Sequence, residues 1–118
     1  MDKFIYKGLL EIDPYDCLCC GDEYLLEKIS DDIRKGDRVS VRYYISSKEI
    51  GEEDANKALL INSFGGDVES ISFVLEAYSE WTIEEYEEIF NVGGHDLYQE
   101  LSSYKGKYLL LIIEKIEE

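Results

Sequence analysis

The alternation of apolar and polar residues predicts strands in several parts of the chain. It is clearest over residues 38–46, where every second residue is apolar: Val39, Val41, Tyr43 and Ile45. This period of two is typical of a strand with one buried face. Residues 3–11 and 68–78 are also predicted to be strands. Residues 107–116 are apolar on both faces, which predicts a central strand covered on both sides.

Apolar residues at helical spacing predict three helices. The first begins near Asp22 and ends before Gly36, the second covers about 52–61, and the third covers 96–104. Residues 81–92 fit a helix as well as a strand, and periodicity alone leaves both open.

These elements predict one small α+β domain over residues 1–118, with a curved, mixed or mostly antiparallel sheet of four to five strands and three helices. No linker-like segment divides the chain. A doubly wound nucleotide-binding fold is disfavoured, because no glycine-rich phosphate loop follows a strand.

Charge is high and unevenly spread. The 118 residues contain 27 Asp and Glu against 12 Lys and Arg, a formal net charge of −15. This excess of acid disfavours broad binding to nucleic-acid phosphates, which depends on Lys and Arg. Residues 34–48 nevertheless carry five cations and one acid, whereas residues 49–104 carry fourteen acids and one cation.

The acidic region offers a candidate interaction face. Its residues are Glu52, Glu53, Asp54, Glu76, Glu80, Glu84, Glu85, Glu87 and Glu88. Carboxylates presented in place of phosphates can occupy the nucleic-acid site of another protein. The simpler alternative is a surface that only keeps the protein soluble.

A second candidate site would take an anionic ligand. Arg38, Arg42 and Tyr44 share the outward face of the strand at 38–46, and this combination suits stacking and anion binding. The turn Gly93-Gly94-His95 precedes a helix, whose free N–H groups can hold an anion. The alternatives are a solvated strand face and a turn followed by a helix cap.

Catalytic and metal sites are not supported. Cys17, Cys19 and Cys20 lack a fourth ligand nearby for a structural zinc, and the only histidine, His95, is distant in sequence. No nucleophile motif accompanies that histidine. We therefore expect no enzyme, no cofactor and no metal.

Compartment is predicted from what the sequence lacks. It has no apolar run of 18 residues and no basic, apolar start typical of a signal peptide. Three crowded cysteines suit reduced thiols better than a disulfide framework. We expect a cytoplasmic protein without membrane contact.

Three segments together resemble small acidic proteins of phages and prophages of low-GC Gram-positive bacteria: residues 39–46, residues 91–97, and residues 100–101 followed by 104–109. The resemblance implies action in the cytoplasm of an infected bacterium and transfers no catalytic residue.

The sequence thus favours a phage accessory protein of the anti-defence type, which binds and inhibits a host factor, for example by DNA mimicry through the acidic face. The expected partner is a host protein, including one that itself binds nucleic acid. The alternatives are a binder that sequesters a nucleotide-type signal at Arg38, Arg42, Tyr44, Gly93, Gly94 and His95, and a structural or assembly protein.

Overall fold

The computed structural model describes residues 2–51, 59–79 and 82–116, and over residues 75–86 it describes the backbone alone. The strands are β1 (Lys3–Ile12), β2 (Leu18–Cys20), β3 (Glu23–Tyr24), β4 (Arg38–Ser46), β5 (Leu59–Ser79), β6 (Thr82–Val92), β7 (His95–Asp96) and β8 (Tyr108–Lys115). The helices are α1 (Leu25–Asp32) and α2 (Leu97–Ser102).

The strands form one curved antiparallel sheet in the order β3-β2-β1-β8-β4-β5-β6-β7. The predicted count of four to five strands and three helices is therefore wrong, since the described residues form eight strands and two helices. Of the helix expected at 52–61, residues 59–61 belong to β5, and residues 52–58 lie outside the described part. The ambiguous segment at 81–92 is strand β6 from Thr82 onward.

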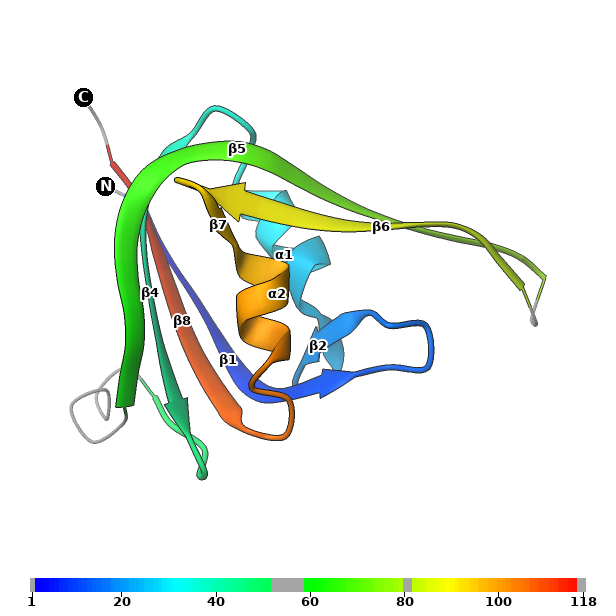
Figure 1. Cartoon of the computed structure of the whole chain (residues 1–118), viewed down its shortest axis with the longest axis horizontal. Helices are drawn as coiled ribbons and strands as arrows, with labels where there is room; N and C mark the ends of the chain where they lie inside the picture. Colours follow the sequence, from blue (N-terminus) through cyan, green and yellow to red (C-terminus); the bar gives the residue numbers. More distant parts are fainter. Residues whose placement is uncertain (1, 52–58, 80–81, 117–118) are drawn as a thin grey trace.

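Strand β5 is the element that gives the sheet its shape. Its first part pairs with β4 and its second part pairs with β6, and the strand bends between the two (Figure 1). The bend follows Gly65 and Gly66, where β5 lies against the β6–β7 turn. A Cβ added at Gly66 would lie 2.7 Å from the Cα of Gly93. Only residues without side chains permit this approach of two backbones.

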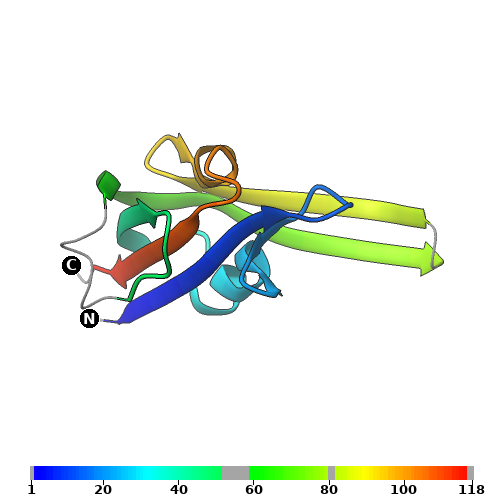
Figure 2. The ribbon, with the colours of Figure 1, turned by 90° about the horizontal axis from the view of Figure 1, so that it is seen from below.

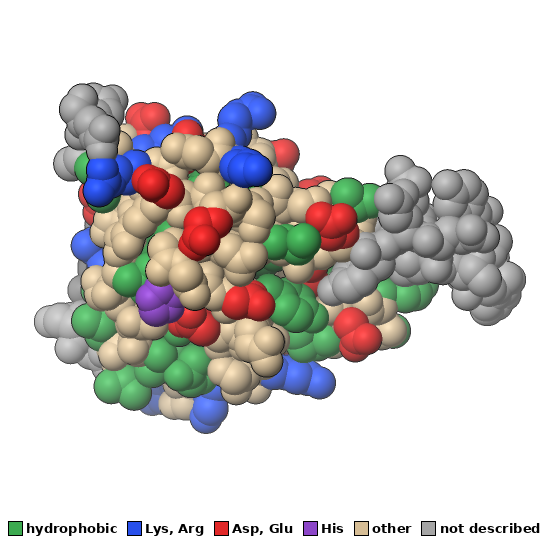
Figure 3. All heavy atoms as spheres, turned by 45° about the horizontal axis from the view of Figure 1, so that its top comes forward, with side chains coloured by type: hydrophobic (Ala, Val, Ile, Leu, Met, Phe, Trp, Pro, Cys, Tyr) green, Lys and Arg blue, Asp and Glu red, His purple; other side chains and the backbone are tan. Residues whose placement is uncertain are grey.

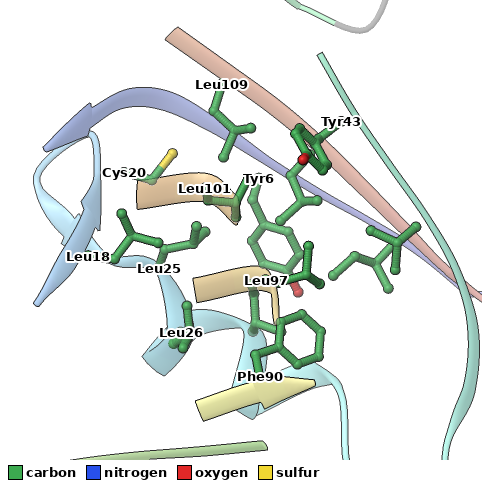
Figure 4. Close-up of a cluster of buried hydrophobic side chains, with 14 of the residues drawn as sticks. Tyr6, Leu18, Cys20, Leu25, Leu26, Tyr43, Phe90, Leu97, Leu101 and Leu109 are labelled. Carbon is green, nitrogen blue, oxygen red and sulfur yellow. The ribbon is translucent and has the colours of Figure 1, made fainter. Parts of the chain in front are cut away.

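The main core fills the hollow of the curved sheet. Both helices lie in this hollow, α1 with Leu25, Leu26 and Ile29 buried and α2 with Leu97 and Leu101 buried (Figure 4). Strand β8 is buried on both faces, as its sequence predicts. Its residues divide between two clusters: Leu109, Leu111 and Ile113 join the main core, and Leu110 and Ile112 pack with Ile50 and Tyr44 outside it.

The hairpin of β5 and β6 extends away from the rest of the molecule. Figure 2 shows both strands continuing past the other elements. The molecule accordingly measures 44 × 35 × 21 Å along its principal axes. We call residues 67–92 the β5–β6 arm.

Within the described residues, neither helix has the length and apolar character needed to cross a membrane.

Candidate functional site

The β5–β6 arm carries most of the predicted acidic face. Residues 67–88 contain eight Asp and Glu and no Lys or Arg. Glu76 in β5 stands opposite Glu85 in β6, and Glu84 is next to it. Glu87 is exposed. Glu52, Glu53, Asp54 and Glu80 lie outside the described residues, and no side-chain position is described for Glu76, Glu84 or Glu85.

Glu88 differs from the exposed Glu87 because it anchors the arm to another part of the chain. Its carboxylate accepts hydrogen bonds from the backbone N–H of Leu18, at 3.2 and 3.1 Å. Leu18 is fully buried at the start of β2, so Glu88 joins the arm to the β1–β2 connection. This half-buried carboxylate therefore already forms hydrogen bonds within the protein.

The β1–β2 loop beside Glu88 is held from several sides. Asp13 accepts bonds from the N–H groups of Tyr15 and Cys17, at 2.9 and 2.8 Å, and from the hydroxyl of Tyr24 at 2.9 Å. The hydroxyl of Tyr98, in α2, donates to the carbonyl oxygen of Asp16 at 2.6 Å. These contacts hold the β1–β2 loop against β3 and α2, and Glu88 joins the arm to the residues that follow this loop.

A polar cluster centred on Glu100 lies near the bend of β5. Its carboxylate accepts from the Tyr43 hydroxyl at 2.9 Å and from the Asn62 amide at 3.1 Å. Its other oxygen is 2.9 Å from Nδ1 of His95. The imidazole stacks on Phe64, with ring centroids 3.8 Å apart and planes inclined by 9°. Figure 3 shows the histidine at the surface between acidic and hydrophobic side chains.

The environment of this cluster favours the ionised form of Glu100. Burial alone would raise its pKa, but hydrogen bonds from Tyr43, His95 and Asn62 outweigh burial and hold the pKa below its ordinary value. Conversely, burial and the bond to Glu100 raise the pKa of the Tyr43 hydroxyl. At the centre of the cluster, the Glu100 carboxylate is therefore held in its ionised form by three hydrogen-bond donors.

The chemistry open to the His95–Glu100 pair is limited. A carboxylate on Nδ1 orients an imidazole as it does in catalytic sites. In the described part of the chain, however, no serine, cysteine or lysine side chain bonds to His95. The cluster joins β4, β5, β7 and α2, so its evident effect is structural.

In the glycine turn that was predicted to hold an anion, both glycine N–H groups already donate to oxygen atoms of the protein. Gly93 and Gly94, with φ of 54° and 84°, form the two-residue turn between β6 and β7. The N–H of Gly93 donates to the carbonyl oxygen of Asp67, and the N–H of Gly94 donates to the carboxylate of Glu69. Asp96 caps α2 by accepting from the N–H of Gln99 at 3.1 Å.

The basic patch and this turn do not form one pocket. Arg42 and Tyr44 alternate along β4 with Tyr43, which points to the Glu100 cluster, so they lie on the other face of the sheet. Tyr44 packs against the outer cluster of β8. Arg42 has its Nη2 3.7 Å from Glu114. Arg38 is exposed at the start of β4, opposite Asp67.

The three cysteines are free thiols, two of them buried: Cys17 and Cys20. Burial and the neighbouring carboxylates of Asp13 and Glu88 raise the pKa of Cys17 to about 12, and burial raises the pKa of Cys20 to about 11. Among the described residues no group of His, Cys, Asp or Glu has the geometry of a metal site. These thiols belong to the core and to the loop beside it.

The Glu100 cluster was not predicted from sequence. Its members come from four elements and are separated by up to 57 residues. The one usable signal was the alternation in β4, which places Tyr43 on the buried face and so requires a partner for its hydroxyl.

Comparison with known proteins adds no assignment: no family model, no curated protein and no solved structure matches this chain.

Proposed function

We propose that this protein acts by binding, without a chemical step, and that the β5–β6 arm engages a basic surface of a partner. The observation that carries the proposal is the arm itself, an extended hairpin with eight acids and no cation over residues 67–88. Such a surface attracts cationic partners and speeds their association.

The anchoring at the base of the arm supports this proposal. Glu88 and Glu69 bond backbone N–H groups of the β1–β2 connection and of the glycine turn. Two acids therefore hold the base of the hairpin in place, and the exposed Asp67 and Glu87 are left to meet a partner. A fixed hairpin loses less conformational freedom on binding than a flexible segment does.

The partner class follows from charge and from the resemblance. A basic surface that holds nucleic acid is complementary in charge to a hairpin that is rich in acids and has no cation over residues 67–88. The resemblance to phage proteins makes the partner a host factor, and the outcome inhibition of that factor. This role is the anti-defence function expected from the sequence.

The test compares two charge-neutralised variants in a host lysate. The arm variant is Glu84→Gln/Glu85→Gln/Glu87→Gln, and the control, which removes three exposed acids elsewhere, is Glu11→Gln/Asp22→Asn/Glu27→Gln. We expect a partner captured by the wild type and the control variant but lost by the arm variant.

Salt and competition then define the mode of binding. Capture should fall as ionic strength rises from about 0.05 to 0.5 M, because exposed charges are screened. Double-stranded DNA should compete with the protein for its partner. The proposal is contradicted if capture of the partner does not change with ionic strength. It is also contradicted if the arm variant and the control variant lose capture equally.

A further inference from the structure

Strand β1 has an open edge in its first half. Between residues 2 and 10 it pairs with β8 on one side, whereas β2 pairs with it only from Leu10 to Ile12. The N–H of Gly21 donates to the carbonyl oxygen of Leu9 at 2.9 Å. Before Leu9, no described strand pairs with β1 on this side. Figure 2 shows the first half of β1 at the margin of the sheet.

The direction of the backbone groups follows from the ladder. Lys115 donates to the carbonyl oxygen of Asp2, and Leu10 donates to that of Lys107, so even-numbered residues of β1 face β8. Successive residues of a strand point their N–H and C=O groups to opposite sides. The backbone groups of Ile5 and Lys7 therefore face the open edge, where no strand of the described chain pairs with them.

A small hollow accompanies this edge. It has a volume of about 160 Å³ and lies between β1 and α1, lined by Ile5, Tyr6, Lys7, Cys20, Glu23, Leu25 and Lys28. The labelled Tyr6, Cys20 and Leu25 in Figure 4 belong to its inner wall. Ile5 is 42% exposed beside it. This is room for one aliphatic side chain next to an unpaired strand.

The charge along residues 3–10 is opposite to that of the whole protein, whereas the hollow beside them is lined by both Glu23 and Lys28, which form an ion pair. Residues 3–10 include Lys3 and Lys7 and no acid. Both lysines share the face of Ile5, because they lie two residues to either side of it. Among the described residues no carboxylate forms an ion pair with Lys7. Edge lysines discourage pairing with neutral or basic strands but favour a strand that brings carboxylates opposite them.

We propose that β1 is a strand-addition site for an extended segment of a partner protein, in which two acidic residues flank an apolar one at alternate positions. The segment pairs antiparallel with Ile5 and Lys7, its carboxylates meet Lys3 and Lys7, and a neighbouring aliphatic side chain enters the hollow. Main-chain bonds supply affinity in this mode and side chains supply selectivity. A second copy of this chain is disfavoured by its net charge of −15.

The probe is the peptide acetyl-Gly-Glu-Val-Ile-Val-Glu-Gly-amide, added to the full chain labelled with nitrogen-15. We expect amide exchange at Ile5 and Lys7 to slow, while Tyr6, whose N–H already faces β8, stays unchanged. N-methylation of the central isoleucine of the peptide should abolish binding. N-methylation of the preceding valine, whose N–H points away from β1, should preserve it.

Two variants test the charge requirement. Lys7→Glu should weaken binding about fivefold at low salt, and Lys105→Glu, at an exposed turn remote in sequence, should not. The proposal is overturned if the peptide leaves the exchange at Ile5 and Lys7 unchanged, or if both N-methyl peptides bind equally. Protection of these amides that rises with protein concentration alone would overturn it too, by identifying a second copy as the occupant.

Discussion

Single carboxylates in this protein do more structural work than its acidic composition suggests. Glu88 bonds the backbone of Leu18, Asp13 organises the β1–β2 loop, and Glu100 gathers three donors. Each accepts hydrogen bonds from groups far away in sequence or at a turn. Because bonds to charged acceptors are stronger than neutral ones, these few acids contribute to stability, while most of the other acids in the described part of the chain are exposed.

Replacing Glu100 by Leu should destabilise the fold by about 2–4 kcal/mol, because the Tyr43 hydroxyl, in a residue only 2% exposed, loses its acceptor. Urea unfolding followed by circular dichroism measures this change. Glu87→Leu, at an exposed position of β6, is the matched control and should stay within about 0.5 kcal/mol of the wild type. Equal effects of the two substitutions would contradict the role of the cluster.

Glu100 also predicts a pH dependence. Its pKa is lower in the folded protein than in the unfolded chain, so its contribution to the free energy of unfolding is present above the ordinary glutamate pKa of 4.5. That contribution is lost as pH falls through the lower folded pKa. Urea midpoints between pH 6 and 3 should therefore fall more steeply for the wild type than for Glu100→Gln. Parallel profiles would disprove this assignment.

The buried thiols should react slowly. Because burial raises the pKa of Cys17 and Cys20, to about 12 and about 11, the thiolate that attacks a disulfide reagent is scarce at pH 8. We expect Ellman's reagent to modify both far more slowly in the native protein than in 6 M guanidinium, where all three cysteines react rapidly. The variants Cys17→Ser and Cys20→Ser assign the slow phases, and fast native reaction at either position would contradict the burial.

At the scale of elements, the spacing of hydrophobic residues predicted the helices and strands that depend on local sequence. It missed the strands that depend on pairing with residues distant in sequence. Strand β4 was confirmed from its alternation, and α1 and α2 were found inside the ranges expected for two of the helices. The helix expected at 52–61 was wrong at residues 59–61, because pairing with β4 overrides the helical spacing of that segment. Strands of two or three residues, such as β3 and β7, have too few positions to show any period.

Gly65-Gly66 shows why the sheet was underestimated. A pair of glycines shortly after the helix expected at 52–61 is typical of a helix end, but it lies within a single strand of 21 residues. Only contact with the turn at Gly93, distant in sequence, explains why glycine is needed there. The same limit applies to the candidate site, since the donors of Glu100 converge only in the folded chain.

Gly66→Ala should therefore destabilise the protein by about 1–3 kcal/mol, because its Cβ would meet the backbone of Gly93, which cannot yield as a side chain can. Gly65→Ala is the control next to it, where the nearest atom would lie at 3.4 Å, an ordinary contact. Thermal unfolding should show a clear loss for the first substitution and a small one for the second. Similar losses would argue against the close approach.

At the scale of the molecule, charge and shape act together. The net charge of −15 opposes compaction, and the arm places part of that charge away from the core. The melting temperature should rise as sodium chloride increases from about 0.02 to 0.5 M, since screening weakens this repulsion. The arm variant Glu84→Gln/Glu85→Gln/Glu87→Gln should gain less from salt than the wild type. If salt raised the melting temperature equally in the wild type and the arm variant, the repulsion would arise from charges outside the arm.

The position of β8 has a consequence for how the chain folds during synthesis. This strand lies between β1 and β4, and its residues from Leu109 to Ile113 are buried, yet it comes after every other described strand in the sequence. Until the ribosome has made it, β1 and β4 have no common neighbour and the inner face of the sheet stays exposed to water. The nascent chain therefore waits in an incompletely closed state, in which its many carboxylates help to prevent association with other chains.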